Sequence, residues 1–101
     1  GGFVEWGEST EQAVVRELEE ETGIKAEVEQ LICVQSEPSR DPRGHTVSVV
    51  YLMKKDFKGD LGGRDDASDA RWWPIASLPK LAFDHAEIVK KAIPIIQLRE
   101  Q

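Results

Sequence analysis

GFVEWGESTEQAVVRELEEETGI, residues 2–24, is the stretch that decides the fold of this chain. Ser9 can act as an N-cap, and Gln12 three residues later completes a capping box. Gly23 stands where a left-handed residue is expected to end a helix. Because residues 10–22 contain neither proline nor glycine, the stretch predicts one helix of about three to four turns.

Three glutamates share one face of this predicted helix. Glu17, Glu20 and Glu21 are spaced i, i+3 and i+4, so their carboxylates lie close together. Like charges at that spacing repel one another and weaken an isolated helix. A hard divalent cation reverses this effect, because oxygen ligands clustered within one turn suit Mg²⁺ or Mn²⁺. The pattern therefore indicates a metal site, and a solvated acidic face is the plain alternative.

The spacing of nine residues in this stretch favours the metal site over the solvated acidic face. They are, in chain order, Gly2, Glu8, Arg16, Glu17, Leu18, Glu20, Glu21, Gly23 and Ile24. At each of these positions the chain resembles the signature of the Nudix hydrolases, which covers about the first quarter of the sequence. The resemblance implies an α/β fold of the Nudix type, that is, an α/β/α sandwich with a mixed sheet.

The composition fits one small domain over residues 1–101. A net charge of −6 and the lack of a basic block argue against a generic nucleic-acid surface or a surface for anionic membranes. There is no apolar run near 18 residues and no signal-peptide pattern. The single cysteine, Cys33, lies in an apolar run, which favours a packed thiol in a reducing cytoplasm.

The chain begins with Gly1-Gly2 and has no initial methionine. Nudix domains usually carry a few strands before this loop, so the resemblance implies that the domain is N-terminally incomplete here. We expect an exposed sheet edge and core face, both of which invite pairing. A neighbouring chain that completes the sheet, and with it a homodimer, is one way to cover them.

Three strand-like segments follow the first helix, at residues 25–34, 45–54 and 70–74. The second is almost continuously hydrophobic, which predicts burial on both faces of a sheet. A last helix is predicted from Asp84, where Glu87 three residues later repeats the capping pattern.

The tryptophans are predicted to be packing residues. We expect Trp6, in the loop before the first helix, to pack rather than to stack on a base. Trp72 and Trp73 occupy adjacent positions of a predicted strand and point to opposite faces. We expect both in the core, and the alternative is that one packs while the other reaches the site. Glu8 is predicted to pair with Arg16 and to hold the loop against the helix.

By resemblance, the chain is expected to hydrolyse a nucleoside diphosphate linked to another moiety, with Mg²⁺ or Mn²⁺ as cofactor. Glu17, Glu20 and Glu21 match the metal-ligand positions of the family, and the carbonyl group of Gly1 corresponds to a further ligand. Arg16 matches the residue that orients the glutamates. One of the glutamates can instead act as the general base, and the sequence leaves open which.

Many family members add a carboxylate from a loop outside the signature, as a base or an extra metal ligand. The candidates here are Asp65, Asp66 and Asp69, of which Asp66 is our first choice. A solvated loop acid is the alternative for each of them.

The loop between the first two predicted strands narrows the choice of substrate. Pro38 lies fifteen residues after Gly23, a spacing that resembles the ADP-ribose pyrophosphatase subgroup, as does the sequence RDPRG at residues 40–44. Arg40 and Arg43 flank a rigid turn and can bind phosphate or terminal-ribose oxygens through charge-assisted hydrogen bonds. The alternative is a stiff, exposed hairpin loop.

These patterns lead to one functional hypothesis and two alternatives. The hypothesis is Mg²⁺-dependent hydrolysis of ADP-ribose to AMP and ribose 5-phosphate. The first alternative is a diphosphatase that acts on (d)NTPs or on oxidised forms such as 8-oxo-dGTP. The second is a non-catalytic Nudix-like domain that binds a nucleotide sugar, although the intact glutamates argue against it.

Overall fold

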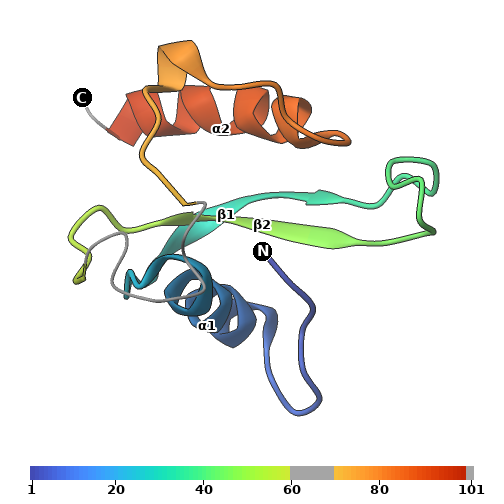
Figure 1. Ribbon diagram of the computed structural model, residues 1–101, viewed down its shortest axis with the longest axis horizontal. Helices are drawn as coiled ribbons and strands as arrows, with labels where there is room; N and C mark the ends of the chain where they lie inside the picture. Colours follow the sequence, from blue (N-terminus) through green and yellow to red (C-terminus); the bar gives the residue numbers. More distant parts are fainter. Residues whose placement is uncertain (60–69, 100–101) are drawn as a thin grey trace. The chain divides into compact units, whose positions relative to one another are not determined.

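The computed structural model describes residues 1–59 and 70–99, and Figure 1 labels their helices and strands. Their elements are, in order, α1 (Thr10–Thr22), β1 (Val28–Gln35), β2 (Ser48–Met53), the 3₁₀ helix η2 (Ile75–Ser77) and α2 (His85–Arg99). The chain divides into two units. The first comprises Gly1–Gln30 and Met53–Trp72, and the second comprises Leu31–Leu52 and Trp73–Gln101.

The helix α1 confirms the prediction for residues 10–22 at both ends. The hydroxyl oxygen of Ser9 accepts a hydrogen bond from the Gln12 backbone N–H at 3.0 Å, and the Gln12 side chain accepts one from the Ser9 N–H at 2.8 Å. Gly23 has a left-handed φ of 77°, and its N–H donates to the Glu19 carbonyl at 2.8 Å. Capping within a few residues therefore sets the length of this helix.

After α1, residues 25–27 pair with residues 54–58 of the first unit through a few backbone hydrogen bonds. Lys25 and Lys58 form an isolated antiparallel bridge with N–O distances of 2.8 and 2.9 Å. The backbone N–H of Lys54 donates to the carbonyl of Glu27 at 2.8 Å. The strand predicted from residue 25 therefore begins later, at Val28, because Lys25 pairs only through this isolated bridge.

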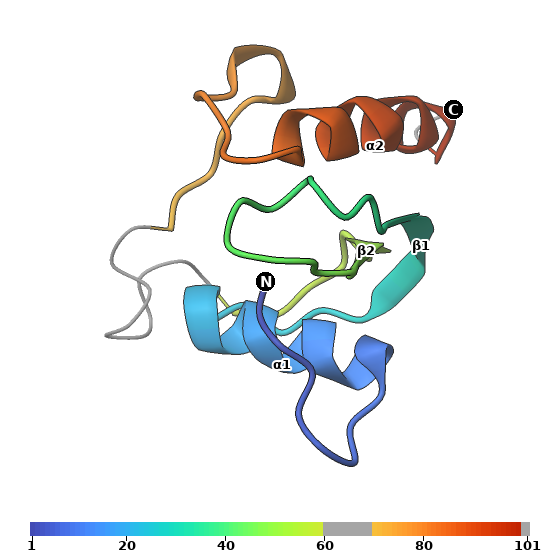
Figure 2. The same ribbon diagram turned by 90° about the vertical axis from the view of Figure 1, so that its right-hand side faces the viewer.

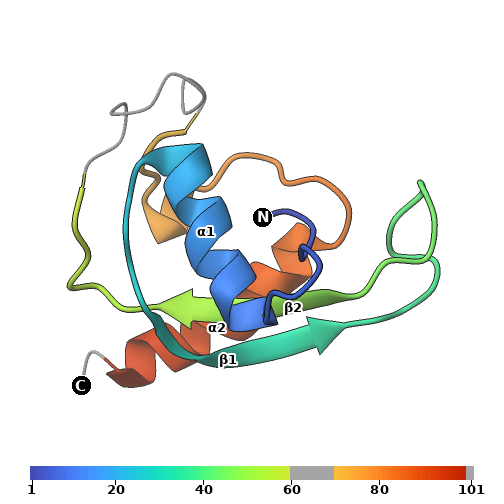
Figure 3. The ribbon, with the colours of Figure 1, turned by 90° about the horizontal axis from the view of Figure 1, so that it is seen from below.

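The strands β1 and β2 are hydrogen-bonded neighbours, and their arrows run in opposite directions in Figure 3. The strand predicted at residues 45–54 is present, but it spans only Ser48–Met53. Its predicted burial on both faces is wrong, because all six residues are partly exposed. Among the described residues β2 has one strand neighbour, β1. Cys33 in β1 is a free, partly buried thiol.

The strand predicted at residues 70–74 is wrong. The structure has no strand at these positions, and Pro74 instead precedes η2, where its carbonyl accepts a hydrogen bond from Ser77 N–H at 3.0 Å. Proline has no N–H to donate to a strand partner, which disfavours sheet pairing here. The core assignment of Trp72 and Trp73 is also wrong, since both are exposed; the Trp72 ring stacks on Phe57 with centroids 5.4 Å apart.

The helix α2 begins at His85, one residue after the predicted start. The carbonyl of Asp84 accepts hydrogen bonds from the backbone N–H groups of Glu87 and Ile88, at 3.0 and 3.2 Å. The helix then continues through Pro94 to Arg99. Within the described residues no helix has the length and apolar character needed to span a bilayer.

Candidate active site

Arg16 is the centre of an ion-pair network in the first unit. Its Nε and Nη2 atoms donate to the two carboxylate oxygens of Glu8 at 2.8 and 3.0 Å, which confirms the predicted pair. Its Nη1 atom donates to Glu17 at 2.8 Å and to Glu20 at 3.2 Å. The hydrogen bond from Arg16 lowers the pKa of Glu8 to about 2 and, in return, raises the pKa of Arg16. The guanidinium therefore connects the loop to two carboxylates of α1.

The N-terminal segment passes across α1, as Figure 2 shows. The Arg16 Nη2 atom donates to the carbonyl of Phe3 at 3.1 Å. A Cβ atom on Gly2 would collide with the carboxylate of Glu17, so any larger residue would displace one of the two. The amino group of Gly1 lies 3.0 Å from Glu21 Oε2. The loop and the acidic face of the helix are therefore in direct contact.

The loop and α1 of the first unit carry the four positions predicted to hold a metal: Gly1, Glu17, Glu20 and Glu21. In residues 1–59 and 70–99 no three acidic, histidine or cysteine side chains converge into a ready-made metal centre. Glu17 and Glu20 instead accept hydrogen bonds from Arg16, and Glu21 Oε2 lies 3.0 Å from the nitrogen of Gly1. The donor set nevertheless fits Mg²⁺ or Mn²⁺ in its chemistry, because it offers only hard oxygen ligands on one side of one helix.

Trp6 lies at the turn of the loop that precedes α1. Its side chain is fully exposed, so the predicted packing role is wrong. The turn is closed by a hydrogen bond from the Glu8 N–H to the Glu5 carbonyl at 3.1 Å, and Gly7 supplies a positive φ of 82°. Backbone geometry and the Glu8 carboxylate therefore hold the loop without help from the indole ring.

The side chain of Arg40 binds other residues of the second unit. Its Nε and Nη2 atoms bind the carboxylate of Asp84 at 2.7 and 2.8 Å, and Nη1 donates to the hydroxyl oxygens of Thr46 and Ser48 at 3.1 and 3.0 Å. The Arg40 side chain is only 6% exposed. The hydrogen bond from Arg40 lowers the pKa of Asp84 to about 2. These contacts fasten the loop of residues 36–46 to the start of α2.

Arg43 lies near the surface on the same loop. Its Nε and Nη2 atoms bind the buried carboxylate of Asp41 at 3.0 and 2.8 Å, and the hydrogen bond lowers the pKa of Asp41 well below its usual range. The guanidinium carbon lies 5.1 Å from the centroid of the Phe83 ring. Pro38 is exposed within the preceding turn, which a hydrogen bond from Arg40 N–H to the Glu37 carbonyl closes at 3.1 Å.

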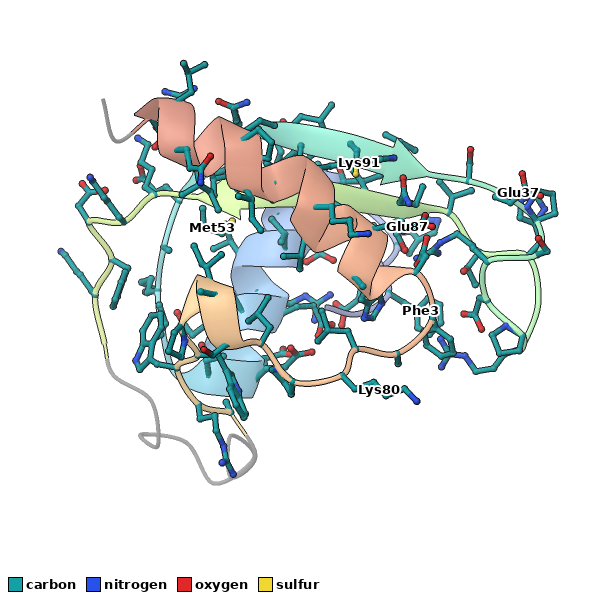
Figure 4. All side chains as sticks on the ribbon, turned by 90° about the horizontal axis from the view of Figure 1, so that it is seen from above. Phe3, Glu37, Met53, Lys80, Glu87 and Lys91 are labelled. Atoms are coloured by element: carbon teal, nitrogen blue, oxygen red, sulfur yellow. The ribbon has the colours of Figure 1, made fainter. Side chains whose placement is uncertain are left out.

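A shallow pocket of the second unit borders this loop. It is lined by Gln35, Ser36, Glu37, Arg40, Asp84 and Glu87. Figure 4 labels Glu37 on the loop and Glu87 and Lys91 on α2, and the Lys91 ammonium group donates to the Gln35 side chain at 2.8 Å.

Some site residues were missed or cannot be placed. The sequence marks Asp84 only as a helix cap, because its partner Arg40 lies 44 positions away. Asp41 lies in the RDPRG run, where only the two arginines were assigned a role, and no pattern marks Phe83. The predicted base candidates Asp65, Asp66 and Asp69 lie outside the described residues.

Comparison with known proteins identifies the family. The NUDIX domain model matches residues 1–92, so the chain belongs to this family, and the fold class expected from the sequence is confirmed. The chain is 51% identical over 90 residues to a protein from Methanocaldococcus jannaschii named ADP-ribose pyrophosphatase. The alignment covers 89% of this chain and 53% of that relative, so the chain spans about half the relative's length.

Two solved structures agree with this assignment. A mutT/nudix family protein from Listeria innocua has a TM-score of 0.72 and 37% identity, over 98% of this chain and 66% of that one. The NUDIX domain of Shewanella oneidensis NrtR, solved in complex with ADP-ribose, has a TM-score of 0.66 and 31% identity, over 94% of this chain and 64% of its own.

Proposed function

We propose that this chain is the catalytic domain of a Nudix pyrophosphohydrolase that converts ADP-ribose to AMP and ribose 5-phosphate with Mg²⁺. The observation that carries this proposal is the set of three carboxylates on α1, from Glu17, Glu20 and Glu21, the first two of which accept hydrogen bonds from Arg16. The 51% identity to an ADP-ribose pyrophosphatase supports the choice of substrate. The single cysteine fits a cytoplasmic enzyme.

In this proposal Glu17, Glu20, Glu21 and the carbonyl of Gly1 hold the cation, with Mn²⁺ as a substitute for Mg²⁺. When bound, the cation supplies positive charge that offsets the repulsion between an attacking water molecule and the pyrophosphate oxygens. The Gly1 ligand requires the loop to stay against the helix.

Arg16 acts as the positioning residue of this site. Its two bonds to Glu8 leave Nη1 directed at Glu17 and Glu20, so the carboxylates keep a fixed orientation. Hydrogen-bonded partners of metal ligands typically contribute a factor of about 10 to 100 in affinity or activity. The general base is Asp66 in our first proposal, and one of the glutamates in the alternative.

The loop of residues 36–46 is proposed to contact the nucleotide. We keep Pro38 and Arg43 as substrate-contacting residues, because both are exposed. Arg40 is proposed to act through the loop, since its donors are engaged by Asp84, Thr46 and Ser48.

A second candidate is a sensor that binds ADP-ribose without cleaving it. The similarity to the NrtR NUDIX domain, which was solved with ADP-ribose, favours this candidate. The intact glutamates of α1 oppose it, because a binding domain has no need of a metal cluster. A third candidate, hydrolysis of (d)NTPs or 8-oxo-dGTP, differs from the first in its products.

The test is a substrate panel with Mg²⁺ and product analysis. ADP-ribose should yield AMP and ribose 5-phosphate, whereas turnover of a triphosphate with release of pyrophosphate would support the third candidate. Glu20→Gln should lose at least about 100-fold in kcat. The matched control is Glu19→Gln on the same helix, where the carboxylate faces Lys25 at 3.8 Å. Tight ADP-ribose binding without turnover in the unmodified chain would favour the sensor.

A further inference from the structure

Arg43 and Phe83 together form an exposed surface in the second unit. The guanidinium carbon lies 5.1 Å from the ring centroid, over the aromatic face. The Arg43 side chain is 69% exposed and Phe83 is 46% exposed. A cation over an aromatic ring is normally a local packing contact. Here, however, most of the Arg43 side chain and about half of the phenylalanine face solvent.

Asp41 already neutralises the charge of Arg43. It binds Nε and Nη2 at 3.0 and 2.8 Å, and its Oδ1 atom also accepts from the Arg43 backbone N–H at 2.9 Å. Because the polar edge of the guanidinium is bound to a buried carboxylate, Arg43 is a poor bidentate ligand for phosphate. Its planar face is the part best suited to contact a ligand.

The backbone holds Phe83 in a strained position. Its φ of 53° is the only positive value among the non-glycine residues that the structure describes. The ion pair between Asp84 and Arg40 fixes the segment on its C-terminal side, and a hydrogen bond from His85 N–H to the Ala82 carbonyl closes the turn. Bulky residues adopt the left-handed region at an energetic cost, and such residues are often found at ligand-binding sites.

We propose that Arg43 and Phe83 form a stacking surface for the purine base of the nucleotide. Planar heterocycles stack on aromatic rings and on guanidinium planes alike, and they need no charge from the protein. The choice of adenine rests on the proposed function. The surface changes the role of Arg43 from a phosphate ligand, as the sequence suggested, to a contact for the base.

The test compares two ligands that share a ribose phosphate, of which only AMP carries a base. Binding of AMP and of ribose 5-phosphate is measured by calorimetry for the unmodified chain, Phe83→Asn and Phe83→Tyr. Asn tolerates the left-handed backbone but lacks a ring, whereas Tyr keeps the ring. We expect the unmodified chain to prefer AMP. Phe83→Asn should weaken AMP binding about tenfold and leave ribose 5-phosphate unchanged, and Phe83→Tyr should bind AMP normally.

Several outcomes would overturn the stacking surface. They are no measurable AMP binding to the unmodified chain, unchanged AMP affinity in Phe83→Asn, and equal weakening for both ligands. A thermal unfolding scan of Phe83→Asn separates lost binding from lost folding, because relief of the backbone strain should keep its midpoint close to that of the unmodified chain. If the chain binds AMP through Phe83 but does not cleave ADP-ribose, the stacking surface stands and the proposed function fails.

Discussion

The guanidinium of Arg16 and the carboxylate of Glu8 form a two-point ion pair, with N–O distances of 2.8 and 3.0 Å. The remaining Nη1 atom bonds Glu17 and Glu20. A residue of the loop thus controls the orientation of the arginine that contacts the acidic face of α1. The order of the proposed metal site should therefore depend on Glu8, although Glu8 is itself not a proposed ligand.

Replacing Glu8 tests this dependence. Glu8→Gln should lower kcat for ADP-ribose by about 10- to 100-fold with a smaller change in KM, because Arg16 loses its charged anchor. Steady-state kinetics at saturating Mg²⁺ measures both constants. The matched control is Glu5→Gln, since Glu5 approaches Arg16 only at 3.7 Å and is 68% exposed. Equal losses in the two variants would refute the special role of Glu8.

Gly2 should be required for metal binding. Gly2→Ala places a methyl group where the Glu17 carboxylate now lies, so either the loop or the carboxylate must move. We expect the affinity for Mn²⁺ to fall about tenfold, as measured by calorimetry or by electron paramagnetic resonance. Circular dichroism should show that α1 is retained. Unchanged Mn²⁺ affinity would mean that Glu17 does not hold the cation.

The Asp84–Arg40 pair should make stability depend on pH. The folded-state pKa of Asp84 is about 2, below its ordinary value of 3.8. Its contribution is therefore complete above about pH 4 and is lost as the pH falls towards 2. Asp84→Asn should lower the thermal midpoint by about 5–10 °C at pH 6, and the difference from the unmodified chain should shrink by pH 2. A difference that stays constant over this range would contradict the assignment.

A change in side-chain size should alter the stability of the fold at Ala13 but hardly at Trp6. Trp6 is fully exposed, so Trp6→Ala should change the free energy of unfolding by less than about 0.5 kcal/mol. Ala13 is the buried residue of α1, and Ala13→Leu should cost about 1–3 kcal/mol through overpacking. Urea unfolding followed by circular dichroism measures both. A large loss in Trp6→Ala would restore the packing role predicted from the sequence.

Local signals explain what could be predicted. The caps at Ser9 and Gly23 lie within a few residues of the bonds they form, and sequence spacing therefore predicted α1 at both ends. The Glu8–Arg16 pair was also predictable, because the family signature contains both residues. The apolar runs identified the cores of β1 and β2, although not the absence of a strand at residues 70–74, and the bounds of both strands depend on pairing with distant residues.

Long-range contacts explain which features could not be predicted from the sequence. Arg40 meets Asp84 44 positions along the chain, and no periodic pattern marks that partnership. A side chain that is predicted to face a substrate is therefore found holding its own loop. The exposure of Trp72 and Trp73 was missed for a related reason, since aromatic residues in a strand-like run are usually buried.

Anomalous X-ray scattering from crystals soaked in Mn²⁺ tests the central claim most directly. A metal site on α1 predicts a strong Mn²⁺ peak with oxygen ligands from Glu17, Glu20 and Glu21 at about 2.2 Å. The same peak should be lost in Glu20→Gln and kept in Glu19→Gln. Crystals that bind no Mn²⁺ at these three carboxylates, while the helix and its loop are well ordered, would contradict the claim.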